Sequence, residues 1–297
     1  MSPRSAREIA GWAEDDHAAA LAAFAVTADL YGMTDLPGPQ EARAFFEERF
    51  DPVEIVPPGA AHFTAYYEPE LAASLTPDDR FCHALYGPPP GFAPGEIWHS
   101  RTAIRAGDLL RGQEIAWVES AIEAFLAQVQ GSVRLRLPDG RAMRLGFAGK
   151  NGHPYRSIGA ELIRRNVSVP AEMTPDRIRR WCRENPGEVD ALLDHNPSFV
   201  FFRVLDLPEG SGPLGAMGRP VVPGRSLAVD PEVIPLGSPV WVDCPGFGAR
   251  LMVAQDIGSA IKGAGRGDLF IGSGAEAGRI AGAINARGAM VLLRRRG

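Results

Sequence analysis

The chain of 297 residues lacks the features that mark several common classes of protein. It has only three cysteines, Cys82, Cys182 and Cys244, which are far apart, so neither a disulfide framework nor a cysteine metal site is expected. No run of 18 apolar residues occurs, so no segment is expected to span a membrane. The first fourteen residues show no basic region followed by an apolar one, and no signal peptide is therefore predicted.

Charge of one sign is also lacking, because 36 acidic residues stand against 31 basic ones and the net charge is −5. The basic footprint that nucleic acid requires is absent, so no nucleic-acid partner is expected. The six histidines include no helical i, i+4 pair, and residues 263–267 lack the third glycine of a dinucleotide loop. No Gly-x-Ser-x-Gly elbow occurs either. We therefore expect no metal, no cofactor and no serine-hydrolase triad.

Glycine and proline are abundant: 34 and 26 residues make up about a fifth of the chain, and 45% of the residues are hydrophobic. Both residue types are poor in helix interiors, which disfavours a helical bundle. The apolar content supports a sizeable core. We predict a β-rich α+β fold of short strands and tight turns, divided into two domains at roughly 150 residues each.

Hydrophobic periodicity predicts the elements. Helices are expected over 16–32, after Pro39, over 118–129 with its end at Gly131, and from Thr174 as N-cap, and 77–95 is expected to be a long loop. The middle contains one hairpin around Pro138-Asp139-Gly140. Further strands are predicted at 62–67, 199–204, 226–229, 240–243, 251–254 and 290–293, with a helix near 275–286. The spacing of the C-terminal strands suggests a closed barrel.

The segment 254–268 is the strongest candidate for a functional site, because it is rich in glycine and carries an aspartate near each end, Asp256 and Asp268. The simpler interpretation is turn chemistry, for which aspartate is common. The other candidates are carboxylates, amides and aromatic rings, the composition of a sugar site. The rings that could stack on a sugar, although each alone is more often a core residue, are Tyr66, Tyr67, Trp98 and Tyr155.

Several motifs, in order along roughly residues 15–295, resemble the membrane-bound lytic murein transglycosylase A family. The first is Phe63-Thr64-Ala65-Tyr66-Tyr67-Glu68-Pro69. The others lie at 129–132, 147–159, 196–202, 226–237 and 254–272. The chain departs from the family at Ser259, where a second glycine is frequent.

The resemblance implies a fold in two parts. Residues 1–70 and 201–297 would form a double-psi β-barrel catalytic domain with N-terminal helices. Residues 71–200 would form a smaller inserted β-domain, and a groove between the two would hold a glycan strand.

The implied activity is that of a peptidoglycan lytic exotransglycosylase, a carbon–oxygen lyase acting on polysaccharides. It cleaves the β-1,4 bond between N-acetylmuramic acid and N-acetylglucosamine without water. The muramyl C6 hydroxyl attacks its own anomeric carbon and leaves a 1,6-anhydro ring. Because this nucleophile is tethered within the substrate, one carboxyl group can act first as acid and then as base.

The family pattern assigns that carboxyl to Asp268. An aspartate with the ordinary pKa near 3.9 is about 0.1% protonated at pH 7, so its pKa would have to rise by roughly 2. Asp256 would raise it or stabilise an oxocarbenium-like state, whereas Lys262 close to Asp268 would lower it. The candidate substrate contacts are Thr64, Tyr66, Gln130, Lys150, Asn151, Tyr155, Arg156 and Lys262.

Two alternatives stay open. One is an inverting hydrolase on the same fold, with Asp256 and Asp268 as base and acid on either side of a water. The other is a non-catalytic glycan-binding module. The resemblance further implies a periplasmic, outer-membrane-associated protein whose partner is the peptidoglycan glycan strand. We expect a monomer; cell-wall synthesis or division complexes are a further implied partner class that no residue of the sequence supports.

Overall fold

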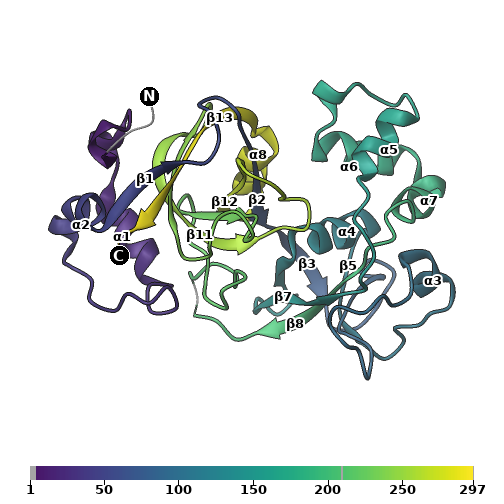
Figure 1. Ribbon diagram of the computed structural model, residues 1–297. Helices are drawn as coiled ribbons and strands as arrows, with labels where there is room; N and C mark the ends of the chain where they lie inside the picture. The colour runs from purple at the N-terminus through teal and green to yellow at the C-terminus, as the bar shows by residue number, and fades with distance from the viewer. Residues whose placement is uncertain (1–4, 209, 297) are drawn as a thin grey trace. The chain divides into compact units, whose positions relative to one another are not determined.

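A computed structural model describes residues 5–208 and 210–296 of the chain, which divide into two compact units. The barrel unit comprises Met1–Tyr67, Glu209–Gly272 and Glu276–Gly297. The insert unit comprises Glu68–Pro208 and Ser273–Ala275. Figure 1 shows both units, each with its own sheet.

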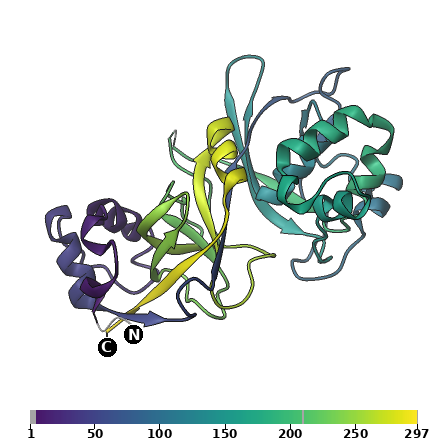
Figure 2. The same cartoon turned by 90° about the horizontal axis from the view of Figure 1, so that it is seen from above.

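The barrel unit begins with helices and continues in strands. Its α-helices are α1 (His17–Ala25), α2 (Ala42–Arg49) and α8 (Gly274–Ala283), and its short 3-10 helices are Ala6–Glu8, Trp12–Glu14 and Pro39–Glu41. Its strands are β1 (Phe50–Glu54), β2 (Ala61–Glu68), β9 (Ser226–Val229), β10 (Pro239–Cys244), β11 (Gly248–Ile257), β12 (Arg266–Ser273) and β13 (Asn285–Arg295). Figure 2 shows α8 and β13, both yellow, beside the green strands, with the purple N-terminal helices at the other end of the unit.

Six of these strands close into a barrel. The order is β13-β10-β11-β9-β12-β2, the pairing of β2 with β13 completes the ring, and β1 is added outside on β13. The pair β9–β11 is parallel, whereas β10–β11 is antiparallel. The closed barrel expected from the spacing of the C-terminal strands is therefore confirmed.

Two apolar clusters stabilise this unit on the two sides of the barrel wall. The interior is filled by side chains such as Phe63, Leu227 and Met252. Outside, α1 and α2 cover Trp241 and Leu251 with the rings of Phe24, Phe46 and neighbouring residues. Alternate residues of β11 thus face opposite sides, as the two-residue period of a strand requires.

The insert unit is built on a second sheet with the order β4-β5-β3-β6-β7-β8. Its strands are β3 (Glu70–Ser74), β4 (His83–Tyr86), β5 (Glu114–Val118), β6 (Ser132–Arg136), β7 (Ala142–Lys150) and β8 (Val200–Leu205). Its α-helices are α3 (Arg101–Ala106), α4 (Ala121–Gln130), α5 (Ile158–Arg164), α6 (Pro175–Glu184) and α7 (Val189–Leu193), and its 3-10 helices are Pro170–Glu172 and Pro186–Glu188. Helix α4 packs on the sheet through Ala124 and Ala127.

Several local predictions are confirmed. The hairpin β6–β7 forms around residues 138–140, helix α4 ends at Gly131 in the left-handed conformation, and Thr174 caps α6 by accepting a hydrogen bond from the Arg177 amide. The chain accommodates Ser259 without strain, because the non-glycine residues with positive φ in the described ranges are Asp108 and Asn166.

Other predictions require correction. The helix predicted over 16–32 ends at Ala25 and continues as turns, and the expected loop 77–95 contains β4. The helix predicted from residue 118 begins at Ala121, because Val118 ends strand β5. The strand predicted at 199–204 was grouped with the barrel strands, but β8 pairs with β7 and belongs to the insert sheet. Hydrogen-bonding partners decide such assignments, and short apolar runs do not encode them.

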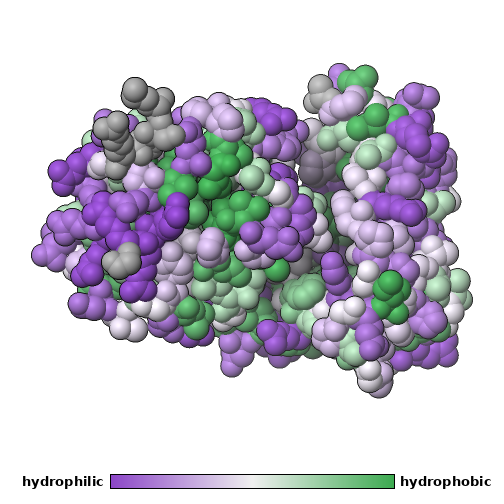
Figure 3. Space-filling model, viewed as in Figure 1, coloured by the Kyte–Doolittle hydropathy of each residue, from purple (hydrophilic) through white to green (hydrophobic). Residues whose placement is uncertain are grey.

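The surface is mixed in character. Figure 3 shows hydrophilic side chains over most of the N-terminal helices and a hydrophobic area over neighbouring strands of the barrel unit. Among the described residues, none of the helices combines the length and the hydropathy that crossing a bilayer requires.

Candidate active site

The two aspartates singled out in the sequence lie on either side of one residue of the barrel. Asp256, near the end of β11, is the register partner of Ala228 in β9. Asp268 in β12 is the register partner of the same Ala228 from the other side. Laterally paired residues share a face of a sheet, so both carboxylates project from one face, two strand spacings or about 10 Å apart at their Cα atoms.

Asp256 is held by three hydrogen-bond donors. Its Oδ1 accepts from the backbone amides of Ala216 at 3.0 Å and of Ile257 at 2.9 Å. Its Oδ2 accepts from the Tyr66 hydroxyl at 2.7 Å. Both oxygens are therefore engaged by groups that donate, and a carboxylate so held is fixed in orientation and stabilised as the anion.

Asp268 accepts fewer hydrogen bonds than Asp256 does. The Thr64 hydroxyl donates to its Oδ1, and Arg266 donates through Nη2 to the Thr64 hydroxyl oxygen at 2.7 Å. Because a guanidinium has no acceptor, the Thr64 hydrogen must be the one directed at Asp268. Within the described ranges no residue donates to Oδ2 of Asp268, which leaves that oxygen available to carry a proton.

Burial raises the pKa of both aspartates. Burial raises the pKa of Asp268 to about 6, with a smaller contribution from the Asp256 carboxylate and opposing ones from Thr64 and Arg266. Burial also raises the pKa of Asp256, against which the Tyr66 hydroxyl and two backbone amides act. At pH 6, about half of an acid with a pKa near 6 is protonated. The site thus pairs a carboxyl that carries a proton near pH 6 with a second carboxyl whose oxygens accept three hydrogen bonds.

Tyr66 stays a hydrogen-bond donor under these conditions. Its ring packs on Phe270 with centroids 5.1 Å apart. Burial, together with the adjacent Asp256 carboxylate, raises the pKa of its hydroxyl well above the ordinary value near 10. The alternation of β2 places Tyr66 two residues from Thr64, on the same face of the strand, so one strand serves both aspartates.

Lys262 does not pair with Asp268. Its Nζ lies 3.3 Å from Oδ1 of Asp230, whose other oxygen accepts from the Gly263 amide at 2.8 Å. That amide, with Lys262 among the weaker causes, lowers the pKa of Asp230. The Lys262 side chain is exposed and pairs with Asp230. The groups that do act to lower the pKa of Asp268 include Thr64 and Arg266.

The insert unit carries the other candidates. Lys150 ends β7 and is exposed, and Tyr155 and Arg156 are exposed in the loop before α5. Gln130 is the last residue of α4. Asn151, by contrast, is fully buried.

The contacts of Asn151 give it a structural role. Its Nδ2 donates to the carbonyls of His99 and Pro197, each at 2.8 Å, and its Oδ1 accepts from the Phe199 amide at 2.8 Å. With both of its polar atoms engaged by the backbone, it holds three loops together. The expectation that Asn151 contacts substrate is corrected on this ground.

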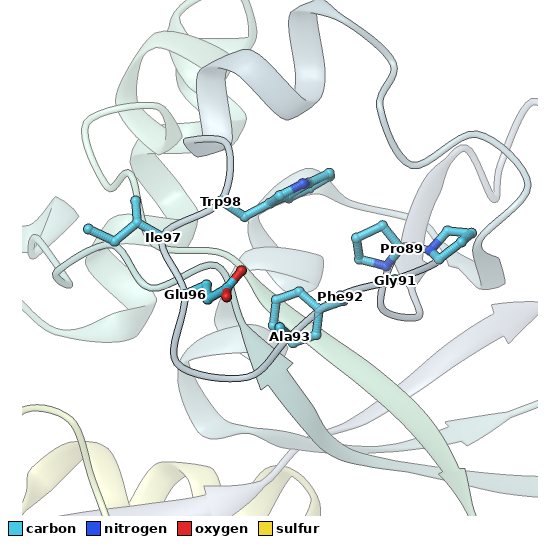
Figure 4. Close-up of a pocket in the computed structure, with 8 residues that line it drawn as sticks. Pro89, Gly91, Phe92, Ala93, Glu96, Ile97 and Trp98 are labelled. Atoms are coloured by element: carbon cyan, nitrogen blue, oxygen red, sulfur yellow. The ribbon is translucent and has the colours of Figure 1, made fainter.

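Trp98 lines a small cavity in the insert unit. The cavity measures about 80 Å³ and is lined by the loop 89–98, including Phe92, Glu96 and Ile97 (Figure 4). Sites that hold small-molecule ligands are several times larger. Trp98 is partly buried and packs edge-on against Phe201 with ring centroids 5.9 Å apart.

Sequence reasoning missed two contributors to the site. Arg266 orients the Thr64 hydroxyl, and the Ala216 amide binds Asp256 from a segment 40 residues earlier in the chain. The position of Arg266, two residues before Asp268 on the same strand, could have signalled it. No local signal could have indicated a backbone amide.

Over the described parts of the chain, no cluster of three or more His, Cys, Asp or Glu that could hold a metal is present, and the three cysteines are free.

Comparisons with known proteins agree with this geometry. The family model "MltA specific insert domain" matches residues 62–203, and the model "3D domain" matches residues 225–294. The latter is the double-psi β-barrel, so the six-stranded barrel has that fold. The chain is 37% identical to membrane-bound lytic murein transglycosylase A of Escherichia coli K12 over 251 residues. That alignment spans 80% of the chain but 66%, just under two thirds, of the relative.

Solved structures extend the likeness over nearly the whole chain. A membrane-bound lytic murein transglycosylase from Agrobacterium tumefaciens is 34% identical, with a TM-score of 0.84 over 98% of this chain and 96% of that one. An Escherichia coli MltA structure with bound chitohexaose is 30% identical, with a TM-score of 0.78 over 95% and 90% of the two chains. With two family models in sequence order and structural likeness of this extent, the chain belongs to the membrane-bound lytic murein transglycosylase A family.

Proposed function

We propose that the protein is a peptidoglycan lytic transglycosylase, a carbon–oxygen lyase that cleaves the β-1,4 bond between N-acetylmuramic acid and N-acetylglucosamine. The observation that carries the proposal is the asymmetry of the two aspartates. Asp268 has a free Oδ2 and a pKa near 6, whereas both oxygens of Asp256 are bound by donors. One acid suffices when the nucleophile belongs to the substrate.

The reaction follows from these roles. Oδ2 of Asp268 gives its proton to the glycosidic oxygen as the bond to the anomeric carbon breaks. The Asp256 carboxylate, two strands away on the same face, stabilises the positive charge that develops on the muramyl ring. The ionised Asp268 then takes the proton of the muramyl C6 hydroxyl as that oxygen bonds to the anomeric carbon. The products are a 1,6-anhydro end and a free 4-hydroxyl, and no water is consumed.

The remaining candidates act as substrate contacts in this proposal. Thr64 and Tyr66 line the site through the bonds described above, and Lys262 is an exposed cation on the neighbouring loop. From the insert unit, the exposed Lys150, Tyr155 and Arg156, together with Gln130, supply further contacts along a glycan. The chitohexaose-bound relative supports an extended sugar chain as ligand. The named relatives support action at a membrane, and we extend this to a periplasmic, outer-membrane-associated monomer.

The test is digestion of purified peptidoglycan followed by mass spectrometry of the soluble fragments. The wild type should release fragments with anhydro-muramyl ends, one water lighter than reducing ends. Asp268→Asn should release none. Reducing ends from the wild type, or full activity in Asp268→Asn, would contradict the proposal.

The inverting hydrolase is kept as the second candidate because of one observation. Two carboxylates on one face, about 10 Å apart at Cα, leave room for the water that an inverting pair requires. In that case Asp256 would be the base, although Tyr66 and two amides already bind it. The same product spectrum decides between the two reactions.

A further inference from the structure

A β-bulge lies directly before Asp256. In the parallel ladder of β11 with β9, Val253 pairs with Ser226 and Ala254 pairs with Leu227. The next pair is Asp256 with Ala228, so Gln255 is an extra residue in β11 without a partner of its own. Two residues of one strand opposing one residue of the other define a bulge, which bends the strand and redirects the side chains that follow.

The bulge decides which way Asp256 faces. Met252 and Ala254 belong to the barrel interior, whereas Val253 packs in the outer cluster with α1. In an unbroken strand Asp256 would follow Met252 and Ala254 into that apolar interior, since a one-residue change of register reverses the face. The extra residue instead aligns Asp256 with Ala228, on the face that carries Asp268.

Gln255 is fixed in this position by its own side chain. It is 1% exposed, and its Nε2 donates to the Ala23 carbonyl at 2.8 Å and to the Thr27 hydroxyl at 2.9 Å. Its Oε1 accepts from the hydroxyl of Ser226. Thr27 and Ser226 are themselves fully buried. The amide thus bridges the end of α1 to β9, and every bond is made away from water, where losing one is costly.

The backbone of the bulge is confined from another direction. A Cβ built on Gly215 would lie 2.6 Å from the Gln255 carbonyl oxygen, so only glycine permits this approach. The next residue, Ala216, donates its amide to Asp256. The loop that binds the carboxylate therefore rests on the bulge that orients it.

We propose that Gln255 is a positioning residue for Asp256, and that α1 acts on the active site through it. The inference rests on the proposed function for its catalytic consequence. Helix α1 lies outside both matched family segments, 62–203 and 225–294, yet its carbonyl and the following Thr27 hold the bulge in register. Loss of the amide frees the bulge, lets Asp256 move from the face of Asp268, and removes its negative charge from the neighbourhood of that acid.

The test compares Gln255→Leu with Thr27→Val, Thr27→Ser and the control Val291→Ala. Val291 lies in the same outer cluster but on β13, so its truncation lowers stability without touching the bulge. We expect Gln255→Leu to lower kcat by up to about 10²-fold, as misplacement of a catalytic group by about 1 Å can do, with a smaller change in KM. Thr27→Val should show the same effect more weakly, and Thr27→Ser, which keeps the hydroxyl, should restore wild-type values.

Two readouts separate positioning from simple destabilisation. The alkaline limb of the kcat–pH profile should move to lower pH in Gln255→Leu and stay in place in Val291→Ala, because Asp256 contributes to the raised pKa of Asp268. Carbon NMR titration of the Asp268 carboxyl, identified by its absence in Asp268→Asn, should report the same lowering without any reaction. If Gln255→Leu does not fold, the two Thr27 variants decide.

The outcomes are distinct. Unchanged kcat, pH profile and Asp268 titration in Gln255→Leu and Thr27→Val, at a stability loss like that of Val291→Ala, would overturn the inference and leave the proposed function standing. Absence of anhydro products from the wild type would overturn the proposed function, while the NMR titration would still test the positioning.

Discussion

The half-buried carboxyl of Asp268 in the barrel unit and the buried carboxyl of Glu161 in the insert unit have opposite environments. Glu161 accepts hydrogen bonds from the guanidinium groups of Arg164 and Arg165, which lower its pKa to about 2. Asp268 accepts one bond, from a neutral hydroxyl, and its pKa rises to about 6. Burial is the largest cause of the raised pKa of Asp268, whereas at Glu161 the hydrogen bonds from the two arginines outweigh the effect of burial.

The contrast teaches how the two units use acidic residues. Guanidinium partners neutralise a buried carboxylate and make it a structural link, as Arg144 does for the fully buried Glu68 as well. In the barrel, Arg266 is close enough to lower the pKa of Asp268, but it donates a hydrogen bond to the Thr64 hydroxyl and not to the carboxylate. A carboxyl left uncompensated in this way is destabilising and reactive, which is typical of catalytic groups.

The largest expected effect is on turnover. Asp268→Asn should lower kcat on peptidoglycan by about 10³-fold or more, because the same group supplies both the acid and the base step. The matched change in the insert unit, Glu161→Gln, should leave kcat near the wild-type value. Both rates are measured as soluble muropeptide released per folded enzyme. A comparable loss of kcat in the two variants would contradict the different roles assigned to the two carboxyl groups.

The next effect is on stability, and its sign should differ between the units. The raised pKa of Asp268 means that the folded state binds a proton that the unfolded state has lost, so wild-type stability falls from about pH 4 to about pH 6. Asp268→Asn, which cannot ionise, should therefore gain up to about 3 kcal/mol at pH 8 and nothing near pH 4. Urea unfolding at the two pH values measures this.

Glu161→Gln serves as the opposite case for the same measurement. Its lowered pKa contributes stability above the unfolded-state value and loses it as the pH falls toward about 2. The variant should thus be less stable than the wild type at pH 8, and the deficit should shrink in acid. A gain in stability from Glu161→Gln at pH 8 would contradict the assignment.

Asp256→Asn should lower kcat by about 10²-fold, less than the loss at Asp268, because an amide keeps the shape but not the charge opposite the developing cation. The alkaline limb of the pH profile should also move to lower pH, since the Asp256 carboxylate raises the pKa of Asp268. A profile that keeps its alkaline limb in Asp256→Asn would show that the two aspartates are not coupled.

The smallest effect is expected from Tyr66→Phe. Removing the hydroxyl takes one of three donors from Asp256 and should cost about 1 kcal/mol in the barrier, or roughly fivefold in kcat. Tyr86→Phe in the insert unit is the control, since burial raises its pKa too but it lies outside the site. Equal losses in both would indicate a general effect of removing a buried hydroxyl.

The sequence predicts what is encoded locally. The turn at residues 138–140, the cap at Thr174 and the end of α4 at Gly131 follow from residue preferences that act within a few positions. The order of the family motifs also led to Asp268 and Asp256. The turn, the cap and the helix end were predictable because neither distant pairing nor solvent exposure decides them.

What could not be predicted depends on pairing across long separations. The bulge at Gln255 is visible only in the register with β9, and the membership of β8 only in its pairing with β7. Asn151 was predicted to bind sugar, but it is buried and its side chain hydrogen-bonds to the backbone of neighbouring loops. Lys262 was predicted near Asp268, but it pairs with Asp230. For both Asn151 and Lys262, the partner of the side chain lies in a segment distant in the sequence.

The central claim is that one carboxyl of the barrel carries the proton through both steps and that water takes no part. Digestion of peptidoglycan in ¹⁸O-labelled water, followed by mass spectrometry of the released fragments, tests it most directly. The account predicts anhydro-muramyl ends that contain no heavy oxygen. Reducing ends that carry one ¹⁸O each would contradict it and assign the two aspartates to an inverting hydrolase.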